Sequence, residues 1–156
     1  MTSKKLFIID NTLSNIEIPH DHGRLPTNIS SHWGSYTANQ WKNWTLVHSL
    51  LVFNDVLPKR DYHLLHTFSQ ACRIVSIPVI TSFVTMIANH FFLKFGKELQ
   101  SLYGDEAATI NLHMHCHLAD CTYYGNLYGF DSGFFPSTKS ISISCFDVIP
   151  LYNLKN

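Results

Sequence analysis

Charged residues are scarce in this chain of 156 residues, and neither sign dominates. Eleven basic and eleven acidic side chains make up 14% of the residues, and the formal net charge is zero with the ten histidines neutral. Proteins that bind nucleic acid through their overall charge are strongly basic, so any DNA contact of this chain has to be local. The hydrophobic content of 46% excludes a chain that is disordered throughout.

Cysteine is also sparse. The four cysteines do not have the dense spacing of a small disulfide-stabilised secreted domain, and no Cys-x-x-Cys pair occurs. The first residues, MTSKKLFIIDNT, lack the long apolar core of a signal peptide. We therefore expect reduced thiols and an intracellular protein, either nuclear or cytoplasmic.

Several common catalytic motifs are missing. HExxH, GxSxG, GxxxxGK[ST] and GxGxxG do not occur, which excludes the metalloproteases, hydrolases and nucleotide-binding proteins that carry them. Cys116 lies between two histidines, but neighbours along a helix do not align for proton transfer in a Cys/His dyad.

One long segment has no formal charge at all. Residues 74–93 reach the length needed to span a bilayer, but polar residues interrupt them. The segment's apolar residues at helical spacing are Ile80, Phe83, Val84, Ile87 and Phe91. We predict a core helix that buries this row of residues, and no membrane span.

The remaining pattern predicts a mainly α-helical fold. Residues 4–18 suit a short helix or a strand, and a long loop follows. Thr37 is a plausible N-cap, with Gln40 at the capping-box position, for a helix over residues 38–53. Trp41, Trp44 and Leu51 would share one face of that helix. The two tryptophans could stack on bases, but two of them three residues apart more often anchor a core.

Further helices are expected over residues 61–77, ended by Pro78, and over residues 79–103, ended by Gly104. Asn111 could cap a fourth. Beyond Gly129 the helical period is lost, and ISISCF at residues 141–146 could form one strand. We therefore expect an irregular or weakly β C-terminal tail.

The segment NLHMHCHLADC, residues 111–121, concentrates histidine and cysteine. His113 and His117 are four residues apart, so on a helix their imidazoles share a face and could bind one Zn²⁺. Cys116 and Cys121 could supply two more ligands, although they come from the adjacent face and from the helix end. The alternative is a polar helix face that carries ordinary histidines.

Five segments, taken in order and spacing, resemble the C-terminal part of CACTA-type transposases of plants and their fungal relatives. They are PHDHGRLPTNI (19–29), SYTANQWKNWTLVHSLL (35–51), LYG (102–104), NLHMHCHL (111–118) and YGNLYGF (124–130). The resemblance covers about residues 4–130. It implies an RNase H-like transposase whose three carboxylates cut and join DNA with two Mg²⁺ ions.

The resemblance also implies that the catalytic acids are missing here. The family's first two acids precede the P-x-D-x-G-R-L-P segment, and its third is expected just after the histidine motif, within a stretch resembling YGFWLFSFERYNG. The match reaches Tyr128-Gly129-Phe130 and then stops, because residues 131–156 contain no glutamate. Codons for this tail, read from the third base of the Asp131 codon, can encode Phe-Trp-Leu-Leu-Ser-Phe. We hypothesise that residues 131–156 are an out-of-frame or disordered tail, and that residues 1–130 form the transposase-like helical region.

In related transposases an HxxxH pair joins a Cys-x-x-Cys pair around a structural Zn²⁺, and only His113 and His117 carry over to this chain. The resemblance thus implies weak zinc binding at best, with Mg²⁺ confined to the intact parent enzyme. Arg24 and Lys42 are the residues we expect to contact DNA.

Two hypotheses about function follow. The first is a helical region of the kind inserted between the second and third acids of an RNase H-like transposase, catalytically incomplete, with a residual role in binding DNA or protein. Exposed apolar helices would then favour self-association. The second is a small zinc-stabilised interaction protein that uses His113, His117, Cys116 and Cys121.

Overall fold

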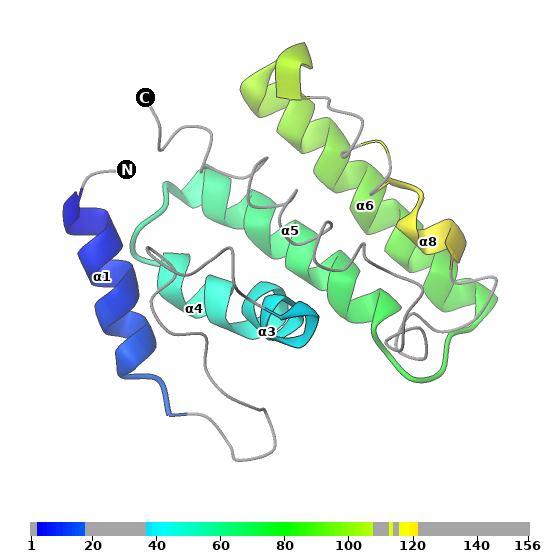
Figure 1. Ribbon diagram of the computed structural model, residues 1–156. Coiled ribbons are helices and arrows are strands. Elements are labelled where there is room, and N and C mark those ends of the chain that lie inside the picture. The colour runs from blue at the N-terminus through cyan, green and yellow to red at the C-terminus, as the bar shows by residue number, and fades with distance from the viewer. Residues whose placement is uncertain (1–2, 18–36, 108–112, 114–115, 122–156) are drawn as a thin grey trace.

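The computed structural model describes residues 3–17, 37–107, 113 and 116–121, and all regular elements within these ranges are helices (Figure 1). The prediction of a mainly α-helical fold is therefore confirmed. The proposed boundary at residue 130, the ISISCF segment and the capping residue Asn111 lie outside the described residues.

The first helix, α1, spans Ser3–Ser14, so the segment that the sequence left open between helix and strand is helical. Ile9 and Leu13, four residues apart, are buried on one side of it. α1 lies at the edge of the protein and contacts α4, the helix Ser49–Phe53 (Figure 1).

The capping box predicted at Thr37 is confirmed. The Thr37 hydroxyl accepts a hydrogen bond from the Gln40 backbone N–H at 3.3 Å, and the Gln40 side-chain oxygen accepts one from the Thr37 N–H at 2.8 Å. This exchange satisfies two donors that the first helical turn would otherwise leave without a partner. It starts α3, which spans Ala38–Asn43.

The predicted helix over residues 38–53 contains a π-helical turn that the sequence did not reveal. This turn, η3, spans Trp44–His48 and leads into α4, Ser49–Phe53. The Ser49 N–H reaches back five residues to the Trp44 carbonyl oxygen. A π turn adds one residue and so shifts every later side chain around the helix axis.

That shift explains why the prediction for Leu51 is wrong. Trp41 and Trp44 are buried in the core as expected, but Leu51, seven residues after Trp44, has 55% of its surface exposed. Val52, one residue later, occupies the inward-facing position and is 2% exposed. The tryptophans therefore anchor the core, and Trp44 packs edge-on against Phe53 with ring centroids 6.0 Å apart.

Two long antiparallel helices form the centre of the fold (Figure 1). They are α5, Lys59–Val75, and α6, Ser82–Tyr103. Both ends of each helix lie within three residues of the positions predicted from the sequence. The Thr81 hydroxyl accepts a hydrogen bond from the Val84 N–H, which sets the start of α6 at Ser82. At the other end, Gly104 leaves the helix with φ of 80°, a conformation that glycine adopts without strain.

A side-chain hydrogen bond joins the open end of this hairpin. The Tyr103 hydroxyl donates to the Asp61 carboxylate at 2.9 Å. Inside the hairpin, the Phe68 ring lies 4.9 Å from that of Phe95 and 6.2 Å from that of Phe92, centroid to centroid. These aromatic contacts form the middle of the core.

The face of α6 predicted to be buried is not the one in the core. Phe83 is 64% exposed, and the other four residues of the predicted row are only partly buried. The buried face carries Thr85, Ala88, Phe92, Phe95, Gly96 and Leu99. Small residues on this face allow neighbouring helices to approach closely. A prediction based on large apolar residues alone does not identify such a face. None of the helices in the described part is both long and apolar enough to cross a membrane.

The short helix α8, Leu118–Cys121, packs against α6 on the side opposite the first helices of the chain (Figure 1). Ala119 is fully buried in this contact, and Cys116 lies beside Gly96. A Cβ atom at Gly96 would be 3.2 Å from the Cys116 sulfur, so glycine permits this close approach. Residues 116–121, which include His117, are thereby held on the surface of α6.

Candidate functional site

The two histidines proposed as zinc ligands lie together. The rings of His113 and His117 are 4.7 Å apart between centroids and nearly perpendicular, at 73°. The two imidazoles therefore lie side by side. Both side chains are exposed, so the pair is open to solvent.

A carboxylate orients one member of the pair. The Nδ1 atom of His117 lies 2.9 Å from an oxygen of Asp120. A carboxylate accepts hydrogen bonds, so Nδ1 is the donor, and in a neutral imidazole Nε2 then keeps the lone pair. A carboxylate behind a ligating imidazole is typical of protein zinc sites.

Cys116 does not join the histidines in the way the zinc hypothesis requires. Its sulfur packs against Gly96 and lies 4.0 Å from the Phe92 carbonyl oxygen, to which the thiol donates a weak hydrogen bond. Burial raises the pKa of the Cys116 thiol, which favours the protonated form over the thiolate that binds metal. The Cys121 side chain lies outside the described part of the structure. No cluster of three or more potential metal ligands occurs within the described residues.

The residues expected to contact DNA are only partly described. Arg24 lies outside the described ranges, and Lys42 is a half-buried residue near the end of α3. DNA binding through these two residues therefore stays a prediction.

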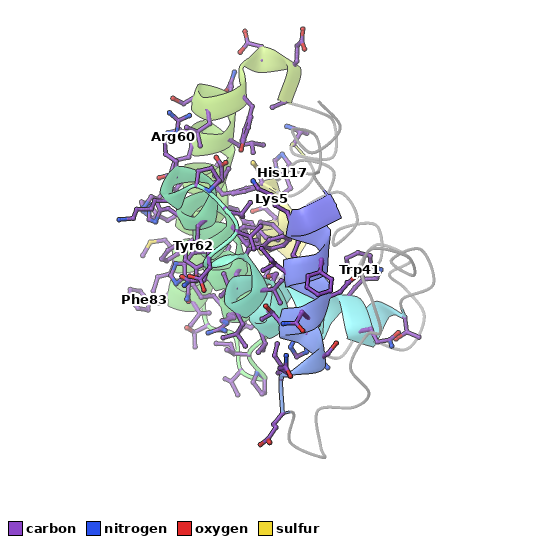
Figure 2. The ribbon with its side chains drawn as sticks, turned by 90° about the vertical axis from the view of Figure 1, so that its left-hand side faces the viewer. Lys5, Trp41, Arg60, Tyr62, Phe83 and His117 are labelled. Atoms are coloured by element: carbon purple, nitrogen blue, oxygen red, sulfur yellow. The ribbon has the colours of Figure 1, made fainter. Side chains whose placement is uncertain are left out.

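An apolar surface on α6 is the feature that sequence analysis missed. Phe83, Met86 and Leu93 have exposed fractions of 64%, 61% and 45%, and Val79, just before the helix, is 74% exposed. Figure 2 shows Phe83 at the outer edge of the protein. His90 and Lys97 continue the same exposed row. We call Phe83, Met86, His90, Leu93 and Lys97 the α6 stripe.

The members of the α6 stripe are alternately three and four residues apart. This is the spacing of the a and d positions in a heptad, which places them along one line of a helix. The exposed face was not evident from the sequence because α6 is apolar on several sides. Ala88 and Gly96 were the available signal, since small residues mark the side on which another helix packs closely.

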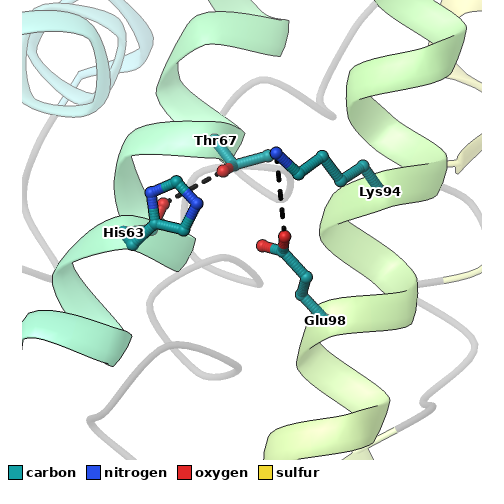
Figure 3. A network of polar contacts seen from close by, with 4 residues as sticks. All are labelled: His63, Thr67, Lys94 and Glu98. Carbon is teal, nitrogen blue, oxygen red and sulfur yellow. Dashed lines mark hydrogen bonds and ion pairs between the residues drawn. The ribbon is translucent and has the colours of Figure 1, made fainter.

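A charged pair borders the α6 stripe without interrupting it. The Lys94 ammonium lies 3.8 Å from the Glu98 carboxylate, one turn further along α6 (Figure 3). On the facing helix, the Thr67 hydroxyl donates to the His63 carbonyl oxygen at 3.0 Å, as Figure 3 also shows. Lys94 and Glu98 are both only partly exposed. Their charges therefore lie at the edge between α5 and the α6 stripe.

No protein-family model, no curated protein and no solved structure matches this chain.

Proposed function

We propose that the protein is a helical interaction module of transposase-like ancestry, without transposase activity, and that the α6 stripe is its binding surface. The observation that carries this proposal is the row of Phe83, Met86 and Leu93 on one exposed face of α6, with Val79 exposed shortly before the helix. Contiguous apolar patches on a protein surface are often interaction sites, whereas single exposed apolar residues are ordinary.

The ancestry and the lack of catalysis rest on the sequence. Five segments in order resemble CACTA-type transposases, and residues 131–156 contain no glutamate to serve as the third acid. The two-ion mechanism needs all three carboxylates to hold both metal ions. Purified protein incubated with Mg²⁺ or Mn²⁺ and duplex DNA should leave the DNA uncut.

Site-specific photo-crosslinking tests the binding surface. A benzophenone amino acid is placed at Phe83 in one variant and at Phe7 in another, and both are expressed in cells. Phe7 is the matched control, because this α1 residue is 72% exposed but lies outside the α6 stripe. We expect protein adducts, identified by mass spectrometry, from position 83 and few from position 7. Equal adduct formation at both positions would contradict the proposal.

The His pair supports a second candidate, a zinc-stabilised interaction protein. His113 and His117 could provide two nitrogen ligands, with Asp120 orienting the second. Cys116 does not fit as a third ligand, because its sulfur faces α6. A bound Zn²⁺ would supply a structural cross-link at this position.

Zinc titration followed by thermal unfolding distinguishes this candidate. A metal that binds only the folded protein raises Tm with concentration. His117→Ala should abolish that increase, while His90→Ala, which removes an exposed histidine of α6, should retain it. A stoichiometric zinc content after purification, with a large loss of stability on adding chelator, would favour the zinc-stabilised protein over the first proposal.

A further inference from the structure

We infer that a Zn²⁺ ion held by His113 and His117 takes its other two ligands from the same histidines of a second copy, and that zinc thereby joins two copies into a dimer. This inference rests on the second candidate function, the zinc-stabilised protein, and names the partner that completes its metal site. It does not involve the α6 stripe.

The two imidazoles are placed to bind one metal ion. Their ring centroids are 4.7 Å apart. Two nitrogens that share a tetrahedral Zn²⁺ are separated by about 3.4 Å, because each Zn–N bond measures about 2.1 Å. Rings at this spacing can present two nitrogens at that separation. The side chain of His117 is 54% exposed, so an ion can reach the pair from solvent.

Each copy offers two ligands within the described residues, whereas a structural zinc site has four. Cys116 is turned away, with its sulfur against Gly96. Asp120 is bound at Nδ1 of His117, and the two nitrogens of an imidazole point to different sides of the ring. A carboxylate bound at Nδ1 therefore does not reach a metal bound at Nε2.

A second copy supplies the missing ligands symmetrically. When the twofold axis of a dimer passes through the ion, both copies contribute the same two histidines and the ion has four nitrogen ligands. The charges also balance, because the Asp120 carboxylates of the two copies, each 56% exposed, offset the double positive charge of Zn²⁺. His117 directly precedes α8, which lies on the side of α6 away from α1, α3 and α4 (Figure 1). A dimer formed there leaves the contacts among those helices intact.

Sedimentation velocity tests the zinc-bridged dimer. The protein is prepared without a histidine tag, treated with chelator, and measured alone, with half an equivalent of Zn²⁺ and with the same amount of Mg²⁺. We expect a monomer alone, and with zinc a dimer that dissociates when EDTA is added. Mg²⁺ prefers oxygen ligands and should leave the monomer unchanged.

Variants of exposed residues connect the dimer to the histidine pair. His113→Ala and His117→Ala should each abolish dimer formation with zinc. His90→Ala, which removes an exposed histidine of α6 outside the pair, should retain it. Asp120→Ala leaves the ligands but removes the carboxylate behind one of them, so it should raise the zinc concentration needed for half-maximal dimer formation by about tenfold. Circular dichroism checks that each variant stays folded.

An excess of zinc distinguishes a bridging ion from an ion that acts within one chain. A bridging ion gives one Zn²⁺ per two chains at the equivalence point of a titration. With several equivalents, each histidine pair binds an ion of its own, so we expect the dimer to dissociate again. A dimer that persists in excess zinc or in EDTA would show that zinc does not hold the copies together, and would overturn the inference.

The outcomes also separate the inference from the candidate function on which it rests. A protein that stays monomeric while zinc raises its Tm, with that increase lost in His117→Ala, would mean that one chain completes the site. This result would overturn the inference and leave the zinc-stabilised protein intact. A monomer whose Tm does not change with zinc would overturn both. Zinc-induced dimers of both His113→Ala and His117→Ala would overturn the assignment to this pair.

Discussion

The Ser69 hydroxyl, on α5, donates a hydrogen bond of 3.0 Å to the backbone carbonyl oxygen of Thr45, inside the π-helical turn. The Ser49 hydroxyl donates to the same oxygen at 3.2 Å. One residue further along the turn, the Arg73 guanidinium donates two hydrogen bonds to the Leu46 carbonyl oxygen. Side chains of α5 thus bind the backbone of the turn where its regular hydrogen bonding changes.

Ser69→Ala should destabilise the protein by about 1 kcal/mol, the usual net value of one buried hydrogen bond. Ser69 and Ser49 are both fully buried, so water cannot replace the lost donor. Urea unfolding of Ser69→Ala, Ser49→Ala and the double variant measures the effect. Because the two hydroxyls share one acceptor, the double variant should lose more than the sum of the single losses. Strict additivity would mean that the shared carbonyl does not couple them.

The π-helical turn is a feature that could not be predicted from the sequence. The capping box could be predicted because its two partners, Thr37 and Gln40, are only three residues apart in the sequence. The carbonyl groups of the π turn are bonded by Ser69 and Arg73, which lie more than twenty residues further along the chain and meet the turn only in the folded protein. The inserted residue then moved Leu51 to the surface and Val52 into the core.

A similar limit applies to the candidate sites. The spacing of His113 and His117 predicted their contact, since four residues make about one helical turn. The exposed face of α6 could not be predicted in this way, because the helix carries large apolar residues on more than one side. Which side is buried was decided by α5 and α8, through packing at Ala88 and Gly96.

The aromatic core between α5 and α6 should dominate stability. Phe68 is fully buried between Phe92 and Phe95, so Phe68→Ala should cost about 3–5 kcal/mol through lost contacts and a residual cavity. Phe83→Ala is the matched control, with the same substitution at an exposed α6 position. It should change the unfolding free energy by about 0.5 kcal/mol or less when measured at low protein concentration. A large loss in the control would mean that Phe83 is not at the surface of the monomer.

The stability of the protein should fall in mildly alkaline solution, in part because of Cys72. Burial raises the pKa of the Cys72 thiol, so the folded protein keeps the proton while the unfolded chain loses it above a pH of about 8.5. The folded state binds more protons there, and the unfolding free energy decreases as pH rises, by up to about 1.4 kcal/mol per pH unit for one group.

Urea unfolding of wild type and Cys72→Ala at pH 7.5 and 9.5, with reducing agent present, isolates this contribution. Other groups that titrate in this range are common to both proteins and cancel. The stability advantage of wild type over Cys72→Ala should shrink by about 1 kcal/mol between the two pH values. An advantage that is constant with pH would show that the Cys72 thiol ionises alike in both states.

The contact between Gly96 and Cys116 predicts an interaction between two substitutions. Alanine is a better helix former than glycine by about 1 kcal/mol, so Gly96→Ala should stabilise α6 wherever the added methyl group fits. In the wild-type protein that methyl group would lie 3.2 Å from the Cys116 sulfur, which has to move and offsets part of the gain. Cys116→Ala removes the sulfur and leaves the space open. Thermal unfolding of the four proteins in this cycle should therefore give a larger rise in Tm for Gly96→Ala in the Cys116→Ala background. Equal shifts in both backgrounds would mean that Cys116 lies further from Gly96 than it does in the structure.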